Sequence, residues 1–334
     1  MISISGLGNS KNSKFCLAII LSGITMLTAC SHAEPDSTTE VAIAEESVDS
    51  SNLEESTSNE SSDSTVYFGV LAIRSATLVH ERYAPLLEYL SEATGRPFEL
   101  VTLNQDSQFT QVAEEKLDFI TSNPLSAVQI QRLHNTNFLT TLERPNTGSQ
   151  FSGLIITGND SGIQTLSDLK GKRVACVDFE TAAAGCLFQI YHLLQNDIDP
   201  FQDFAEFAEN PSQDNIVLAV LNQTIDAGFI RTGQLELMVK KNLIENIEGI
   251  KILEPKNDDF FFPHTTDLYP EWPIASLPNT EPALSEAVEA ALLNISDDHP
   301  ALETAQVSSF LPPENYDPIH NMIEALKLKS WDAQ

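Results

Sequence analysis

The sequence has few cysteines and few basic residues, and each shortage excludes a class of protein. Its 334 residues include four cysteines, too few for a disulfide-stapled scaffold. No CxxC, HxxH or HExxH spacing occurs, so we predict no metal site. Lys and Arg number 18 against 48 acids, a formal charge of −30. Such a chain repels phosphate backbones, which argues against a nucleic-acid partner.

The sequence also lacks the short motifs of common enzymes. It contains no Gly-x-Ser-x-Gly turn, no phosphate-binding P-loop and no carboxylate pair with catalytic spacing. We therefore predict no catalytic activity and no cofactor. With 42% apolar residues and a length of about two average domains, the chain can still bury a sizeable core.

The N-terminus carries the sequence's most membrane-like segment. Lys11 and Lys14 precede an apolar run at residues 15–27, which is too short to span a bilayer and is typical of a signal peptide. The run ends in Leu27-Thr28-Ala29-Cys30, which resembles a bacterial lipobox. We predict that residues 1–30 are a lipoprotein signal peptide with its lipobox, and that Cys30 is acylated. An ordinary signal peptide followed by a chance cysteine is the alternative.

Residues 31–65 have the composition of a disordered linker. They include ten acids, no Lys or Arg and no aromatic residue, so they cannot bury enough surface to offset their ordering entropy. Repulsion between like charges extends such a segment. We predict an acidic, Ser-rich tether that holds a folded domain off the membrane. The protein would then be a membrane-tethered lipoprotein outside the cytoplasm, in the periplasm or on the outer cell surface.

From residue 66 on, apolar β-branched runs alternate with amphipathic stretches. Residues 66–73 are typical of a buried strand, and Asn123-Pro124 predicts an N-cap with Pro in the first turn of a helix. The alternation restarts near residue 166, so we predict two α/β units with largely parallel sheets. A helix over residues 78–92 is predicted by an apolar stripe at Val79, Tyr83, Leu86, Leu87 and Leu90.

Several of these segments carry a resemblance to a known family. From residue 66 to the end, the chain resembles the solute-binding proteins of phosphonate and phosphite ABC importers. It resembles still more closely the extracytoplasmic sensor modules of tetrathionate-type histidine kinases. The segments are Phe68-Gly-Val-Leu-Ala-Ile-Arg74, Thr121-Ser-Asn-Pro124, Leu166-Ser-Asp-Leu-Lys-Gly-Lys-Arg-Val174, Asp226-Ala-Gly-Phe-Ile-Arg-Thr-Gly233, Leu268-Tyr-Pro-Glu-Trp-Pro273 and Leu311-Pro-Pro-Glu-Asn-Tyr316.

The resemblance implies an α/β protein with a type II periplasmic-binding-protein fold, in which crossover strands join two lobes around a ligand cleft. On that basis residues 66–150 plus 256–334 form lobe 1, and residues 151–255 form lobe 2. The implied function is capture of a small ligand, an oxyanion of phosphonate, phosphite or phosphate type, for an ABC permease. The alternative is a ligand-sensing accessory protein for a membrane histidine kinase or another signalling partner.

The predicted site lies beyond the carboxyl ends of the strands, where open α/β sheets bind their ligands. Two arginines and a helix N-terminus at these ends favour a small oxyanion. Instead of binding a ligand, Arg74 would pair with Glu81 in the alternative interpretation, and Ser122 and Asn123 would cap a helix. The predicted ligand-binding residues are Arg74, Thr121, Ser122, Asn123, Glu180, Thr181, Arg231, Thr232, His264 and Thr265.

One segment departs from the phosphonate-binding pattern. Phosphonate binders place a hydroxyl-rich turn with Ser-Gly at the start of the lobe 2 helix, whereas this chain has Glu180-Thr-Ala-Ala-Ala-Gly-Cys186. Alanine side chains donate nothing and Glu180 repels a dianion, although helix amides still bind anions. Another oxyanion or a zwitterion is therefore an alternative ligand. Cys176 and Cys186 form either a disulfide, which is permitted outside the cytoplasm, or two buried thiols.

Overall fold

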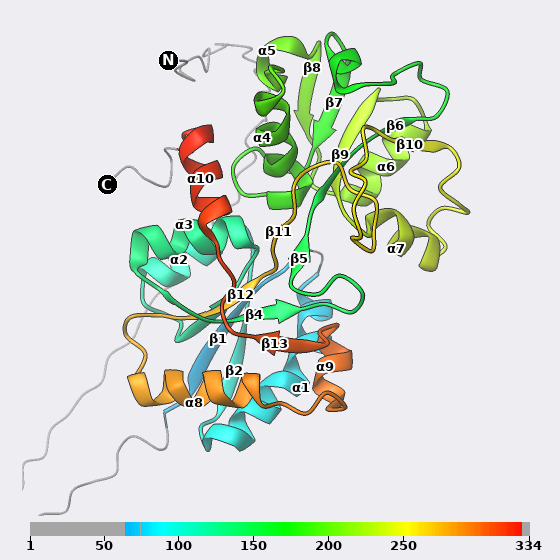
Figure 1. The fold of residues 1–334 in the computed structure, drawn as a ribbon. Helices are drawn as coiled ribbons and strands as arrows, with labels where there is room; N and C mark the ends of the chain where they lie inside the picture. The colour runs from blue at the N-terminus through cyan, green and yellow to red at the C-terminus, as the bar shows by residue number, and fades with distance from the viewer. Residues whose placement is uncertain (1–63, 74, 329–334) are drawn as a thin grey trace, which may run out of the picture. The chain divides into compact units, whose positions relative to one another are not determined.

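The computed structural model describes residues 64–73 and 75–328 of the chain (Figure 1). The predicted signal peptide, Cys30, nearly all of the linker at residues 31–65, and Arg74 lie outside the described residues. No helix within the described ranges is both long enough and apolar enough to cross a membrane.

The first sheet has six strands in the order β13-β4-β12-β3-β1-β2. Strand β1 pairs parallel with β2 and β3, whereas β12 is antiparallel to β3 and β4, and β13 is antiparallel to β4. The prediction of a largely parallel sheet is therefore wrong, because three of the five strand pairings are antiparallel. The strands are β1 (Val66–Leu71), β2 (Phe98–Leu103), β3 (Phe119–Thr121), β4 (Asn137–Glu143), β12 (Pro273–Ser276) and β13 (Ser309–Leu311).

The physical reason for this mixed sheet is where its last strands come from. Parallel neighbours need a crossover, usually helical, between successive strands of one sheet. Strands β12 and β13 instead belong to the chain that has already passed through the second sheet and returned. They run in the opposite direction to β3 and β4, because the chain enters the first sheet again from the second sheet.

Helices cover the first sheet on both faces. The predicted stripe at residues 79–90 is confirmed, because the same five side chains are the buried ones of α1, which runs from its Ser75 cap to Gly95. Helix α1 packs with α8 and α9 over one core, and Tyr89 donates a hydrogen bond to the carbonyl oxygen of Ala291 (2.8 Å). The helices are α1 (Ala76–Thr94), α2 (Ser107–Ala113), α3 (Pro124–His134), α8 (Pro282–Leu293) and α9 (Pro300–Ala305).

The second sheet has five strands in the order β10-β6-β9-β7-β8. Strand β7 is parallel to β8 and β9, while β6 is antiparallel to β9 and β10, so this sheet is also mixed. The strands are β6 (Gly153–Gly158), β7 (Arg173–Cys176), β8 (Glu206–Glu209), β9 (Ala227–Arg231) and β10 (Ile250–Ile252). The helical elements are η1 (Leu166–Leu169), η2 (Ala183–Leu187), α4 (Phe188–Gln195), α5 (Pro200–Asp203), α6 (Gln213–Leu221) and α7 (Gln234–Lys240).

Two segments connect the two sheets, and a third leads from the first sheet to a helix that contacts both groups of helices. Residues 144–152 and 253–272 pair with each other as β5 (Gln150–Phe151) and β11 (Tyr269–Pro270). Residues 312–316 lead into α10 (Asp317–Leu326), which contacts both α3 and α4. We call each sheet with its helices lobe 1 and lobe 2, in chain order. The predicted fold class, two α/β lobes joined by crossover strands, is confirmed.

Candidate functional site

The lobe 1 wall of the predicted site is the turn from β3 into α3. Asn123 caps α3, because its Oδ1 accepts a hydrogen bond from the backbone N–H of Ser126 (3.1 Å) and Pro124 occupies the first turn. Ser122 Oγ donates to Gln108 Oε1 (2.5 Å), so this hydroxyl is held by α2. Thr121 Oγ1 is buried and has no hydrogen-bond partner among the described residues.

The lobe 2 wall begins with a tight turn after β7. Asp178 Oδ1 accepts hydrogen bonds from the backbone N–H of Glu180 (2.9 Å), and from both the N–H (2.7 Å) and the hydroxyl (2.8 Å) of Thr181. Glu180 is exposed and Thr181 is buried. The Thr181 hydroxyl is therefore committed to the turn, which leaves backbone groups as the donors on this wall.

The lobe 2 helix starts as a π-turn rather than an α-helix. In η2 the N–H of Leu187 donates to the carbonyl oxygen of Ala182 (3.0 Å), and a disulfide joins Cys176 to Cys186. A side chain at Gly185 would place its Cβ 2.9 Å from Val177 Cγ2, so only glycine fits there. The sequence predicts a helix over residues 182–196, and the structure begins this helix on a turn type that is frequent at functional sites.

Both walls present helix starts, and a hydrogen bond joins them. Asn123 Nδ2 donates to the carbonyl oxygen of Thr181 (3.2 Å), so the structure brings these two predicted site residues together. The N–H groups of Ala182, Ala183 and Ala184 have no acceptor in the described part of the chain. The first N–H groups of a helix lack partners within it and carry partial positive charge, which suits an anion.

Arg231 is the last residue of β9 and Thr232 follows it, and both bond this end of the strand to neighbouring segments. The backbone N–H of Arg231 donates to Gln213 Oε1 (2.9 Å), and Arg231 Nη1 donates to the carbonyl oxygen of Thr232 (3.3 Å). Thr232 Oγ1 accepts from the N–H of Ser152 (3.3 Å), at the end of the first crossover. Arg231 is half-buried, so its guanidinium is held at this strand end, whereas Thr232 is bonded to the crossover.

His264 and Thr265 lie in the second crossover and bond to their own surroundings. The two ring nitrogens of His264 contact the carbonyl oxygen of Thr266 (2.7 Å) and the carboxylate of Asp258 (3.0 Å). The hydroxyl of Thr265 donates to the carbonyl oxygen of Leu253 (2.9 Å). Both side chains are fully occupied in holding the crossover, and a contact with ligand stays a prediction.

Sequence reasoning missed three glutamines that shape the site. Gln108 and Gln213 hold Ser122 and Arg231, as described above. Gln189 is fully buried, and its Nε2 donates to the carbonyl oxygens of Leu154 (3.1 Å), Ala184 (2.7 Å) and Ile230 (2.9 Å). It therefore ties η2 to β6 and β9. The available signal was Gln189 itself, a polar residue on the apolar face of the helix predicted over residues 182–196.

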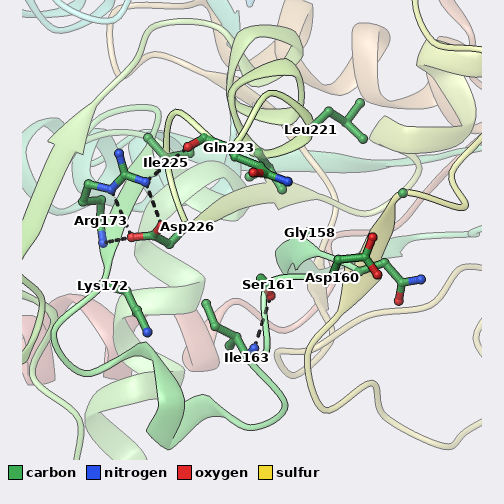
Figure 2. A pocket seen from close by; sticks show the side chains of 13 residues that line it. Gly158, Asp160, Ser161, Ile163, Lys172, Arg173, Leu221, Gln223, Ile225 and Asp226 are labelled. Atoms are coloured by element: carbon green, nitrogen blue, oxygen red, sulfur yellow. Dashed lines mark hydrogen bonds and ion pairs between the residues drawn. The ribbon is translucent and has the colours of Figure 1, made fainter.

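A pocket of about 450 Å³ lies elsewhere in lobe 2 (Figure 2). Lys172, Arg173 and Asp226 line it, at the amino ends of β7 and β9 and so away from the predicted site. Arg173 Nη2 lies 2.8 Å from Asp226 Oδ1. Hydrogen bonding by this guanidinium lowers the pKa of the Asp226 carboxyl. The ion pair fills one side of the pocket and ties two strands together.

Two comparisons with solved structures support the fold. A Xanthomonas citri protein bound to ATP has a TM-score of 0.66 and 18% sequence identity, covering 79% of this chain and 98% of that one. PhnD1 from Prochlorococcus marinus, in complex with methylphosphonate, has a TM-score of 0.65 and 16% identity over the same shares. At these identities the likeness establishes the arrangement of the chain alone.

Comparisons of sequence identify the family. The chain is 29% identical over 278 residues to the tetrathionate sensor histidine kinase TtrS of Salmonella typhimurium, covering 80% of this chain and 46% of the relative. It therefore spans about half the length of that protein. A family model described as the periplasmic substrate-binding protein of phosphonate ABC transporters matches residues 68–317. The chain belongs to this family of periplasmic substrate-binding proteins.

Proposed function

We propose that this protein is an extracytoplasmic receptor, tethered by lipid at Cys30, that captures a small oxyanion and delivers it to an ABC importer. One observation carries the proposal. The starts of α3 and η2, from different lobes, meet where Asn123 bonds to Thr181, and η2 offers backbone N–H groups that have no acceptor among residues 64–73 and 75–328. Family membership supports a periplasmic location and a substrate-binding role.

The donors at this site favour a compact anion held mainly by backbone groups. Thr181 and Ser122 have hydroxyls already engaged with Asp178 and Gln108, so they offer less than the hydroxyl-rich turn of the phosphonate pattern. Arg231 supplies a charged donor, and charge-assisted hydrogen bonds are roughly twice as strong as neutral ones. Glu180 is exposed, so water and salt weaken its repulsion of a dianion.

Binding would work by closure of the two lobes, residues 66–150 plus 256–334 against residues 151–255, about the crossover segments. A ligand favours the closed arrangement only to the extent that it binds that arrangement more tightly. A ligand that touches both helix starts satisfies this condition, because those contacts exist only when the walls are close. No covalent step is needed, so the ligand leaves unchanged.

A thermal-shift screen tests this function. Methylphosphonate, phosphite, phosphate, sulfate, tetrathionate and the zwitterion glycine betaine are added separately to the full chain. A ligand at 100 times its Kd stabilises the folded state by about 2.7 kcal/mol, so the melting temperature rises. Arg231→Ala should abolish the shift that the best oxyanion gives, while Lys251→Ala, in lobe 2, keeps it. No shift with any oxyanion, or a shift only with glycine betaine, contradicts the proposal.

Sensing is the second candidate, and the similarity to the tetrathionate sensor kinase favours it. In that case the chain would pass its ligand-dependent arrangement to a membrane kinase or another signalling partner. Deleting the gene separates the two roles. Loss of uptake of isotope-labelled ligand supports transport, whereas normal uptake with loss of a ligand-induced transcriptional response supports sensing.

A further inference from the structure

Two proline-rich motifs from the sequence meet in the structure at Glu271. This residue belongs to the Tyr-Pro-Glu-Trp-Pro motif in the second crossover. Its N–H donates to the carbonyl oxygen of Ser149 in the first crossover (2.7 Å), and its own carbonyl oxygen accepts from the hydroxyl of Tyr316 (2.7 Å). Tyr316 ends the Pro-Pro-Glu-Asn-Tyr motif and precedes α10. All three segments that connect the lobes are therefore bonded through one residue.

The side chain of Glu271 adds a nearly buried ion pair to this junction. Its carboxylate lies 3.6 Å from Arg144 Nε, and the two side chains are 9% and 23% exposed. Burial lowers the pKa of Arg144, but the charge of Glu271 and the contact with Tyr83 outweigh burial, so the pKa is raised overall. Arg144 directly follows β4, so the pair joins the start of the first crossover to the end of the second.

Two further contacts tie the same junction to lobe 1. The Tyr316 hydroxyl lies 2.9 Å from Thr141 Oγ1, which also accepts a hydrogen bond from the N–H of Glu314 (3.0 Å). Glu314 Oε1 in turn accepts from the hydroxyl of Ser149 (2.6 Å). Thr141 belongs to β4, so the base of every connecting segment is fixed to the lobe 1 sheet.

A short two-stranded segment, β5 paired with β11, separates the contacts around Glu271 from the residues that attach the crossovers to lobe 2. Strands β5 and β11 pair over two residues each, and Ser152 follows directly. Ser152 Oγ lies 2.8 Å from Thr266 Oγ1, and the N–H of Thr232 donates to the Ser152 carbonyl oxygen (2.9 Å). Thr232 is next to Arg231 at the candidate site. The angle at which the β5–β11 pair leaves Glu271 therefore influences the position of the lobe 2 turn at Thr181 relative to Asn123.

We propose that Arg144, Glu271 and Tyr316 form a hinge clamp that selects the arrangement of the lobes in which Asn123 contacts Thr181. They are positioning residues, since none of them belongs to the candidate site. Replacing a buried ion pair with apolar residues is often neutral for stability, so its use here is to fix one geometry. The clamp's effect on lobe arrangement stands independently of the ligand, and its effect on affinity rests on the proposed function.

Interlobe distances test the clamp without any ligand. Glu92 in lobe 1 and Glu245 in lobe 2 are both exposed, and each is replaced by a keto-bearing amino acid that accepts a nitroxide label, leaving all cysteines intact. Pulsed electron resonance then gives the distribution of label distances in the full chain. We expect the wild type to show a narrow main peak and a minor population of other spacings. Tyr316→Phe removes one hydroxyl and should raise the population of other spacings about fivefold, the effect of one lost hydrogen bond.

Glu271→Gln keeps the size of the side chain and removes its charge, so it should broaden the distribution further. Asp226→Asn is the matched control, because it breaks the Arg173 ion pair within lobe 2 and touches no connecting segment. Broadening in Tyr316→Phe and Glu271→Gln but not in Asp226→Asn supports the clamp. If Glu271→Gln does not fold, the distance distribution of Tyr316→Phe alone tests the clamp. Wild-type distributions in the clamp variants, or equal broadening in the control, overturn it.

A parallel titration with methylphosphonate separates this proposal from the proposed function. Weaker binding by Tyr316→Phe than by the wild type extends the clamp's role to affinity. Equal binding by both, despite a broadened distance distribution, overturns the link to affinity. If wild-type protein binds neither methylphosphonate nor the other oxyanions of the screen, the proposed function fails, and the distance distributions still decide the clamp.

Discussion

Removing the Cys176–Cys186 disulfide should destabilise the protein by about 3 kcal/mol. The two cysteines are 10 residues apart, and the chain-entropy expression for a closed loop of this length gives roughly 3 kcal/mol at 25 °C. For a domain of this size each kcal/mol corresponds to about 2–4 °C, so the melting temperature should fall by roughly 6–12 °C. The loss acts on η2, because Cys186 lies within that turn.

Equilibrium unfolding in urea, followed by circular dichroism, measures this effect by two routes. The first route is the double variant Cys176→Ala, Cys186→Ala. The second is wild-type protein kept reduced throughout, which loses the crosslink without losing the two buried sulfur atoms. We expect the reduced wild type to lose about 3 kcal/mol and the variant somewhat more, because alanine also leaves space in the core. Equal midpoints for reduced and oxidised wild type would refute the reasoning.

Three further predictions address the anchor, the site and the ion pair. Cys30→Ala should move the protein from the membrane fraction to the soluble fraction, and its persistence in membranes contradicts lipidation. Asn123→Ala should lower the free energy of unfolding by about 1 kcal/mol, because the helix cap is lost. Asn123→Ser should keep the cap and lose the contact with Thr181. Urea unfolding should therefore show near wild-type stability for Asn123→Ser, while its ligand affinity should fall. Hydrogen bonding to Arg173 lowers the pKa of Asp226 below its usual 3.8, so this carboxylate stabilises the fold above about pH 4 and loses that effect as pH falls further. Asp226→Asn should therefore be less stable than the wild type at pH 7, and the difference should shrink at pH 3.

Local signals in the sequence predicted the helices well. The stripe from Val79 to Leu90 marks the buried face of α1, because a helix packed on a sheet repeats its apolar residues every three to four positions. Asn123 with Pro124 marks the start of α3, since the side-chain cap and the missing proline N–H act within one turn. Such features depend on neighbouring residues alone, which the sequence contains in full.

Features that depend on distant parts of the chain were missed. Strand β12 has four residues and β13 has three, too few to show a period, and their antiparallel pairing depends on the route of the whole chain. The π-turn at η2 depends on the approach of Val177 to Gly185 and on the disulfide. A helical pattern was correct for residues 188–195 and could not reveal the different turn that precedes them.

The sequence predicted where the candidate site should lie but not how its side chains are bonded, and ligand binding there stays a prediction. Strand ends indicated Asn123 and Thr181 because ligands of such sheets gather there, and the structure brings those two residues together. The hydrogen bonds that engage Ser122 and Thr181 come from Gln108 and Asp178. Which hydroxyl is already bonded depends on side-chain geometry, and residue type does not determine it.

The strong negative charge of the chain is compatible with an anionic ligand. A formal charge of −30 acts at long range, but ten of the acids lie in residues 31–65, and physiological salt screens exposed charges beyond about 8 Å. In the proposed site the donors are the backbone N–H groups of η2 and the guanidinium of Arg231, and such donors act over hydrogen-bond distances. Net charge therefore slows the approach of an anion, while affinity is set by the local donors. If the candidate site binds an anion, as proposed, this balance of charge selects for a ligand small enough to reach those donors.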